Sequence, residues 1–247
     1  MRRRFFVDEV RNGKAQIEGE EARHLSRVLR VEAGQRYEIS DNRNVYLAEI
    51  ETARKENIIF KTLEKFPAAS PSARFELYAA LIKFDRFEWI VEKATELGVT
   101  EIVPIEATRS ERGLEKAAAK RVERWRRIAL EASQQSRRTH LPEIDGPISL
   151  NDAIARTVSY RYVLDESPGV APLMKALPAE RTVHDTIAIL TGPEGGWTDE
   201  ERNSFTGAGW TPVSMGPLIL RSETAVIAAL AVVTQAWLVS PTGKIVR

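Results

Sequence analysis

The stretch TIAILTGPEGGWTDEE, residues 186–201, combines an apolar strand, a glycine-rich loop and the start of a helix. Residues 186–190 are mostly apolar, which is typical of a strand that is buried on both faces of a sheet. Thr198, followed three positions later by Glu201, forms a capping box that begins a helix. A buried strand that leads directly into a helix predicts a parallel sheet covered by helices.

The same alternation of strands and helices extends from residue 71 to the C-terminus. Strands are predicted at residues 75–82, 101–105, 160–164, 186–190 and 212–215, and helices at residues 85–97 and 115–135 and from residues 198 and 222. Asp85 and Ser222 stand where helix N-caps are expected, and Gly98 stands where a C-cap is expected. Residues 71–247 are therefore predicted to be an α/β domain that binds its ligand at the carboxyl ends of parallel strands.

The N-terminal part of the chain has a different pattern. Residues 37–40, 44–50 and 57–63 alternate apolar and polar side chains, as half-buried strands do, and residues 20–30 have the spacing of an amphipathic helix. The stretch PAASPS, residues 67–72, lacks periodicity and reads as a linker. We therefore expect a small, mostly β domain over residues 1–70 and a boundary near residue 70.

The composition of the 247 residues excludes several classes of protein. The chain has no cysteine, which excludes disulfides and thiolate chemistry, and His24, His140 and His184 do not have the spacing of metal ligands. The sequence has no apolar run of about 18 residues, so no transmembrane helix is predicted. The basic start MRRRFF is followed by Asp8 and Glu9 and not by the apolar segment of a secretory signal, so a cytoplasmic location is expected.

The net charge of +1 hides an uneven distribution of charge. Residues 109–138 contain ten basic and four acidic side chains. Such a segment suits contact with the phosphates of a nucleic acid. The alternative is a solvated helix face with internal ion pairs, such as Glu123 with Arg127, and charge alone favours this alternative.

The glycine-rich loop, residues 190–197, carries the first chemical signal. Three glycines and a proline allow a ligand to approach the backbone closely, and the helix start adds free N–H donors. The loop lacks the Gly-Lys-Ser/Thr of triphosphate sites, and no Gly-x-Gly-x-x-Gly follows a strand, so dinucleotide binding and the Rossmann methyltransferase architecture have no support. A purely structural turn is the alternative, but a ligand-binding loop is favoured.

A second loop, MGPLILRSETA, spans residues 215–225. Gly216 and Pro217 indicate a sharp turn, and Arg221 and Glu223 stand at the opening of an apolar helix. Glu223 suits a helix N-terminus for purely electrostatic reasons. Arg221 has no equally simple structural explanation and indicates an anionic or enolate-like ligand.

The two loops together resemble those of the SPOUT superfamily of knotted methyltransferases. Within it the chain is similar to the bacterial 16S ribosomal RNA uridine-N3 methyltransferase family. The resemblance is carried by residues 23–30, 93–99, 109–110, 131–138, 192–196 and 219–225, six motifs in the family's order. Each motif is weak by itself, but the six at compatible spacing are specific.

The resemblance implies a PUA-like RNA-binding β-barrel over residues 1–70 and a SPOUT methyltransferase domain with a C-terminal trefoil knot over residues 71–247. It also implies S-adenosyl-L-methionine as cofactor, a homodimer, and methylation of N3 of one uridine in 16S rRNA of the small ribosomal subunit. A related SPOUT enzyme that methylates a ribose 2′-hydroxyl or tRNA, and a non-catalytic RNA-binding ribosome-assembly factor, are the alternatives.

The resemblance also implies residue roles. The expected cofactor-binding residues are Leu190, Thr191, Gly192, Pro193, Glu194, Gly195, Gly196, Met215, Gly216, Pro217, Leu218, Ile219, Leu220 and Thr224. The expected RNA-binding residues are Arg23, His24, Arg27, Arg30, Arg109, Arg137 and Arg138. From its position beside the second loop, and not from the resemblance, Arg221 is the expected catalytic cation, and Glu223 and Glu194 are candidates for the base. Leu218 departs from the family, which usually has a basic residue there.

Overall fold

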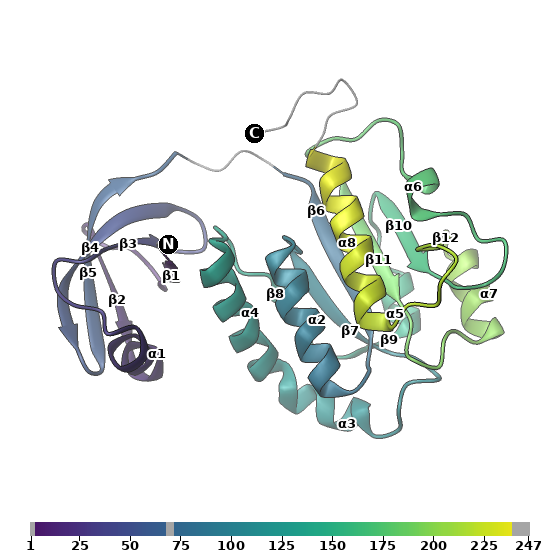
Figure 1. The fold of residues 1–247 in the computed structure, drawn as a ribbon, viewed down its shortest axis with the longest axis horizontal. Coiled ribbons are helices and arrows are strands. Elements are labelled where there is room, and N and C mark those ends of the chain that lie inside the picture. Colours follow the sequence, from purple (N-terminus) through teal and green to yellow (C-terminus); the bar gives the residue numbers. More distant parts are fainter. Residues whose placement is uncertain (1–2, 68–71, 239–247) are drawn as a thin grey trace. The chain divides into compact units, whose positions relative to one another are not determined.

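The computed structural model describes residues 3–67 and 72–238 and contains two compact units (Figure 1). Unit 1 comprises Met1–Ala69 and Leu130–Leu141, and unit 2 comprises Ser70–Ala129 and Pro142–Arg247. The predicted linker includes residues 68–71, which lie outside the described residues. Among the residues described, no helix is long and apolar enough to span a membrane.

Unit 2 is built on a seven-stranded sheet in which every neighbouring pair of strands is parallel. The order is β12-β10-β11-β6-β7-β8, and β9 also pairs with β7. The strands are β6 (Arg74–Ala80), β7 (Glu101–Glu106), β8 (Glu143–Ile144), β9 (Ile148–Ser149), β10 (Tyr160–Leu164), β11 (Thr186–Thr191) and β12 (Thr211–Val213). The predicted parallel α/β domain is confirmed.

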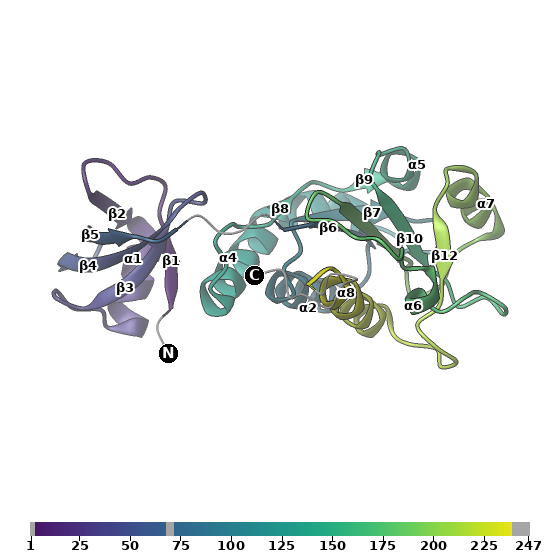
Figure 2. The ribbon, with the colours of Figure 1, turned by 90° about the horizontal axis from the view of Figure 1, so that it is seen from above.

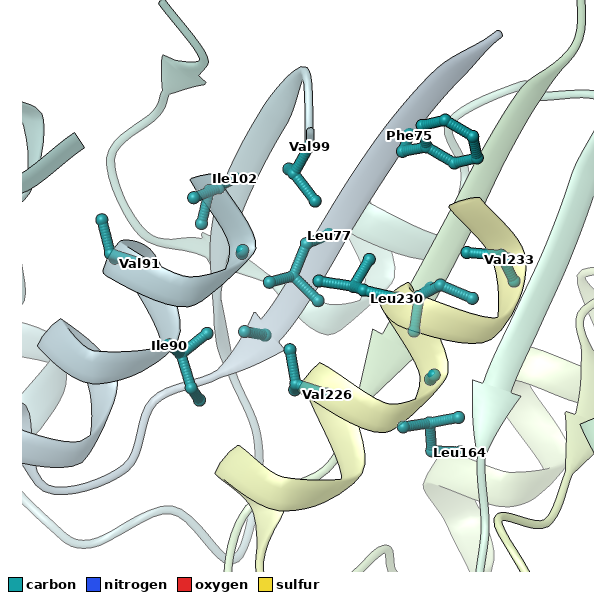
Figure 3. Close-up of a cluster of buried hydrophobic side chains, with 14 of the residues drawn as sticks. Phe75, Leu77, Ile90, Val91, Val99, Ile102, Leu164, Val226, Leu230 and Val233 are labelled. Carbon is teal, nitrogen blue, oxygen red and sulfur yellow. The ribbon is translucent and has the colours of Figure 1, made fainter. Parts of the chain in front are cut away.

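Helices cover both faces of this sheet (Figure 2). They are α2 (Phe84–Glu96), α3 (Leu114–Ala118), α4 (Val122–Ser136), α5 (Leu150–Ile154), α6 (Leu173–Ala176), α7 (Asp199–Gly207) and α8 (Ser222–Leu238). Leu77 of β6 packs in the core with α2 and α8, whereas the next residue, Tyr78, packs with α5 and α7. Figure 3 shows Leu77 between Ile90 of α2 and Leu230 of α8.

Three predictions about these helices need correction. Ser222, expected as the N-cap of α8, is instead the first residue of that helix, and the amide of Ala225 donates to the carbonyl of Arg221. The helix predicted at residues 115–135 is divided, because a 3₁₀ turn at Ala119–Arg121 separates α3 from α4. Asp85 is not the cap of α2, since the helix begins one residue earlier and Lys83 occupies the N-cap position. Asp85 instead lies in the first turn, where a carboxylate is favoured by the helix dipole.

Unit 1 contains a five-stranded sheet in the order β1-β3-β4-β5-β2. The strands are β1 (Arg4–Phe6), β2 (Lys14–Glu18), β3 (Arg36–Ser40), β4 (Val45–Arg54) and β5 (Asn57–Lys65). β1 is parallel to β3, and the other pairs are antiparallel. All five strands and α1 (Gly19–His24) contribute to one apolar core. A π-helical turn at Leu25–Leu29 continues α1 and ends at Arg30, whose φ of 50° is left-handed.

The segment after α4 joins unit 1 through hydrogen bonds to strands far away in the sequence. Arg4 donates to the carbonyl of Arg137 at 2.7 Å, and the Ser40 hydroxyl donates to the carbonyl of Thr139 at 2.6 Å. Arg4 and Arg137 also form ion pairs with Glu38. Burial alone would raise the pKa of Glu38, but the hydrogen bonds and charges of Arg4 and Arg137 outweigh burial and lower this pKa.

Replacing Glu38 by Gln is expected to destabilise the protein by about 1 to 3 kcal/mol at pH 7, because two arginines lose a nearly buried carboxylate partner. A lowered folded-state pKa contributes stability above the unfolded-state value of roughly 4 that is lost as pH falls through the folded-state value. Urea denaturation should therefore show a difference between wild type and Glu38→Gln at pH 7 that shrinks below roughly pH 4.

Glu49→Gln is the matched control, because Glu49 pairs with Arg36 at an exposed site on the same sheet. Its effect should stay below about 1 kcal/mol. Equal stability of Glu38→Gln and wild type at pH 7 would contradict the role given to Glu38.

Candidate functional site

A pocket of about 340 Å³ lies in unit 2, where the loops that follow β10, β11 and β12 meet. This volume is within the range of small-molecule sites. Parallel strands place their carboxyl ends at the same edge of the sheet, which is the edge where α/β proteins bind ligands. The residues that line the pocket are Arg86, Leu164, Asp165, Glu166, Thr191, Gly192, Pro193, Glu194, Gly196, Trp197, Arg202, Val213, Ser214, Met215, Gly216, Pro217, Leu218, Ile219, Leu220, Arg221, Ser222 and Ala225.

The glycine-rich loop forms one wall of this pocket. Its turn is closed by a hydrogen bond of 2.9 Å from the amide of Gly196 to the carbonyl of Pro193, and Gly196 has a left-handed φ of 68°. A Cβ on Gly192 would lie 2.9 Å from the indole ring of Trp197, so this glycine is needed for packing. Leu190 is fully buried in β11 and, like Gly195, does not line the pocket.

Trp197 attaches the end of this loop to the sheet. Its indole Nε1 donates to the carbonyl of Leu164 at 3.0 Å, and its ring packs edge-on against Phe205 of α7 at 5.6 Å between centroids. The side chain is almost completely buried. The path of the glycine-rich loop is therefore set by a rigid ring that is fixed to the end of β10.

The second loop forms another part of the pocket wall. All six residues from Met215 to Leu220 line the pocket, and within this group Leu218 and Ile219 are 77% and 83% exposed. Ser222 lies in the first turn of α8, and its hydroxyl donates to the carbonyl of Gly192 at 3.1 Å, which links the two loops. Thr224 is exposed and lies outside the pocket.

Arg221 lines the pocket with an exposed side chain. Within residues 3–67 and 72–238, no carboxylate forms an ion pair with its guanidinium. A guanidinium without such a partner at the wall of a pocket is available to bind negative charge on a ligand.

Charged residues that follow β10 also reach the pocket. Asp165 is almost fully buried, and its carboxylate is 3.1 Å from Nε of Arg202. Burial raises the pKa of Asp165, but hydrogen bonds from Arg202 and Ser167 outweigh it, so the pKa is lowered and the group is held ionised. Glu166 is exposed beside Gly196 and provides a further carboxylate at the pocket wall.

Arg86, in the first turn of α2, connects the two loops from a third direction. It forms an ion pair with Glu194 of the first loop, and its Nε lies 4.0 Å from Oε1 of Glu223 at the start of α8. Glu223 has a side chain that is only 11% exposed and does not line the pocket. In the described part of the chain, its Oε2 has no hydrogen-bond partner.

Comparison with known proteins identifies the family. Residues 69–234 match the model of an RNA methyltransferase domain, and residues 17–63 match that of an RNA methyltransferase PUA domain. Ribosomal RNA small subunit methyltransferase E of Aquifex aeolicus is 31% identical over 229 residues, which cover 92% of this chain and 97% of that protein. The chain belongs to the ribosomal RNA small subunit methyltransferase E family.

Two further methyltransferases of this family agree with that result. The Bacillus subtilis protein is 30% identical over 228 residues, which cover 88% of each chain. The crystal structure of ribosomal RNA small subunit methyltransferase E from Neisseria gonorrhoeae bound to S-adenosyl methionine matches with a TM-score of 0.85 at 28% identity, covering 96% of this chain and 98% of that chain. The family and the fold class predicted from the sequence are confirmed.

In this family member, the residues expected to bind RNA fall into three groups. Arg23, His24, Arg27 and Arg30 are all exposed along α1 and the π-helical turn of unit 1. Arg137 and Arg138 also belong to unit 1, where Arg137 pairs with Glu38 and Arg138 donates to the carbonyl of His140 at 3.0 Å. Arg109 belongs to unit 2 and donates to backbone carbonyls of the glycine-rich loop.

Several other arginines of the basic segment 109–138 are paired within unit 2. Arg121 and Arg124 both form ion pairs with Glu88, and Arg126 pairs with Glu123. Of these pairs, only that of Arg126 with Glu123 lies within one helix, as the solvated-face alternative expected, because Glu88 belongs to α2. In the described ranges, no group of three or more His, Cys, Asp or Glu side chains is arranged to hold a metal ion.

Sequence reasoning missed some residues of the pocket. Asp165 and Glu166 directly follow the predicted strand 160–164, so the rule that ligands bind at strand ends was a sufficient signal. Arg86 and Arg202 lie on helices and carry no comparable signal, because helical arginines are common on any surface.

Gly192→Ala is expected to destabilise the protein by about 1 to 3 kcal/mol, since the new methyl group would overlap a Trp197 ring that cannot move aside. Gly207→Ala is the matched control, because a Cβ there meets no atom within 4 Å at the end of α7, and its effect should be neutral or slightly stabilising. Thermal denaturation compares the two variants. The same midpoint for both would show that Trp197 does not restrict the loop.

Proposed function

We propose that this protein transfers a methyl group from S-adenosyl-L-methionine to N3 of a uridine in the 16S rRNA of the small ribosomal subunit. The observation that carries the proposal is the pocket itself, which is lined by two loops of an RNA methyltransferase domain and by an arginine that has no carboxylate partner among the described residues. Membership of the family supports RNA methylation, and the arginine supports a target base that becomes an anion.

The pocket fits the proposed cofactor in chemistry as well as volume. Leu164, Val213 and Leu220 offer apolar surface to an adenine ring, and Asp165 and Glu166 offer carboxylates to hydroxyl or ammonium groups. The relative from Neisseria gonorrhoeae was crystallised with S-adenosyl methionine. When bound, this cofactor supplies an electrophilic methyl group on a sulfonium.

Arg221 is proposed to stabilise the uracil anion. N3 of uridine carries a proton that must leave before or during the attack, and the resulting negative charge spreads to O2 and O4. A fixed cation near these oxygens lowers the energy of the anion without reorganisation of solvent. Glu194 is paired with Arg86, and Glu223 is buried outside the pocket, so both carboxylates have structural roles that Arg221 lacks.

RNA binding is proposed to involve unit 1. The PUA match covers residues 17–63, which include the exposed arginines Arg23, Arg27 and Arg30 and the exposed His24. Cations clustered on one exposed helix provide phosphate contacts. We therefore assign residues 1–70 to a PUA-like RNA-binding domain and residues 71–247 to a SPOUT methyltransferase domain.

A trefoil knot and a cytoplasmic location complete the proposal. The chain leaves the edge strand β12 and returns as α8, which packs against β11 and α2, and Ser222 bonds to the loop after β11. This return of the chain end to the loop after β11 supports the proposed knot.

A cytoplasmic location follows from the proposed substrate, because bacterial small ribosomal subunits are in the cytoplasm.

The proposal is tested by methylation of 30S particles and of free 16S rRNA from a strain that lacks the enzyme, with mass mapping of the product. N3-methyluridine at one site supports the proposal. A 2′-O-methyl product, a methylated tRNA in a parallel reaction, or the absence of any product would instead favour one of the alternatives.

The same assay tests Arg221. Arg221→Ala is expected to lower the single-turnover rate by about 100- to 1000-fold with little change in cofactor affinity, and Arg221→Lys should retain part of the rate. Lys175→Ala, which removes an exposed cation on α6, is the control and should be unaffected. Transfer at nearly the wild-type rate by Arg221→Ala would exclude the proposed role.

We further propose a homodimer in which a second copy covers the outer side of α8. This helix is apolar around its circumference, and Ile227, Ala231 and Val232 are partly exposed. Trp89 on α2, which packs beside α8, is 42% exposed. A helix without a polar face is normally covered on all sides, and a homodimer would cover this one.

Light scattering should give twice the mass of one chain for the wild type and one chain mass for Ala231→Glu, since a carboxylate at a dry interface lacks a partner. Asn203→Glu, at an exposed position of α7, is the control and should remain dimeric. A monomeric wild type would refute the dimer.

A further inference from the structure

Arg109 lies directly against the glycine-rich loop. It follows β7, and its Nη1 donates to the carbonyl of Gly195 and to the carbonyl of Trp197, each at 3.1 Å. A Cβ on Gly195 would lie 2.9 Å from Cβ of Arg109, so the absence of a side chain at Gly195 is what allows this approach. Arg109 itself does not line the pocket.

The backbone beside Arg109 is joined to the same region. The amide of Thr108 donates to Oε1 of Glu201 at 2.8 Å, and Oε2 of Glu201 accepts the amide of Thr198 at 2.8 Å. Glu201 is buried at the start of α7. One carboxylate therefore connects the segment after β7 to the end of the glycine-rich loop and fixes Arg109 in position.

Arg86 holds the same loop from another neighbouring strand. It follows β6, lies in the first turn of α2 and pairs with Glu194, one residue before Gly195. In the sheet, β6 lies between β11 and β7, so the strands that lead to Arg86 and Arg109 are the two that follow β11 in spatial order. The loop after β11 is thus held by an arginine from each of them.

The loop needs such support because of its composition. Glycine loses more conformational freedom on ordering than any other residue, and the loop contains three glycines within five residues. If the arginines order the loop before a ligand arrives, the ligand does not have to supply that free energy on binding. Loss of Arg109 would therefore lower ligand affinity although Arg109 does not line the pocket, whereas Arg86 lines the pocket and also holds the loop.

We infer that Arg109 is a positioning residue of the cofactor loop, acting together with Arg86, and that it does not contact RNA phosphates. The inference rests on the proposed function, since it takes the ligand of the pocket to be S-adenosyl-L-methionine. It changes the role that the sequence assigns to Arg109, because Nη1 donates to two loop carbonyls and so holds the guanidinium against the loop.

The test measures how tightly the full-length variants Arg109→Gln and Arg109→Lys bind S-adenosyl-L-methionine and 16S rRNA. Calorimetry gives the Kd of S-adenosyl-L-methionine, and filter binding of 16S rRNA at several salt concentrations gives the salt dependence. Arg109→Gln should raise the Kd and the KM for the cofactor about 10-fold, with a smaller effect on kcat, and should leave the salt slope unchanged.

Arg109→Lys separates the two roles. Lysine keeps the positive charge that a phosphate contact requires, but it lacks the length and the planar donors with which Arg109 reaches two carbonyls. A positioning role predicts that cofactor affinity stays weakened in Arg109→Lys. If Arg109→Gln fails to fold in a thermal denaturation control, Arg109→Lys alone decides the question.

Three further variants serve as references. Arg112→Gln removes an exposed cation three residues away and should leave the cofactor Kd at the wild-type value. Arg27→Gln, on the exposed helix of unit 1, should reduce the salt slope of RNA binding by about 0.7 to 0.9 without changing the cofactor Kd. Glu194→Gln, which breaks the pair with Arg86, should weaken cofactor binding in a way that is not additive with Arg109→Gln.

The outcomes are distinct. A wild-type cofactor Kd in Arg109→Gln or Arg109→Lys, or a reduced salt slope in Arg109→Gln, would overturn the inference while the wild-type enzyme still binds cofactor. A wild-type protein that binds no S-adenosyl-L-methionine with or without RNA would instead overturn the proposed function.

Discussion

The parallel alignment of β12, β10, β11, β6 and β7 is the constraint on which the rest of unit 2 depends. It places the carboxyl ends of all five strands at one edge of the sheet, so that segments far apart in the sequence meet there. Helices cover both faces of the sheet, and the edge is where polar side chains and free backbone groups gather. The pocket is a consequence of this pairing and not of any single motif.

Arginine side chains hold the irregular loops in place at that edge of the sheet. Arg86, Arg109 and Arg202 each bind a carboxylate or a backbone carbonyl of the loops, and the planar guanidinium can serve two acceptors at once. Arg221 differs from them because no carboxylate of the described residues neutralises it. The same residue type thus has a structural role at three positions, and at the fourth is free to act on a ligand.

The sequence predicted local features well. Strand 160–164 has the predicted bounds, and the capping box of Thr198 with Glu201 forms both of its hydrogen bonds. Predictions from the sequence were weaker where the role of a residue depends on contacts with residues far away in the chain. Two of the loop glycines are needed for packing against Trp197 and Arg109, a reason that a count of glycines cannot distinguish from ligand approach. Arg137 likewise pairs with a carboxylate 99 positions away.

The sequence by itself determined the strand and helix pattern, the parallel α/β class and the family, because periodicity, caps and ordered motifs are properties of short segments. Only the tertiary structure decided which carboxylate or backbone carbonyl each arginine binds. Arg109 reaches Gly195 across 86 positions, and Arg86 reaches Glu194 across 108. The physical reason is that a hydrogen bond or an ion pair depends on distance in space, which strand order sets, whereas a charge pattern along the chain specifies only the sign of a side chain.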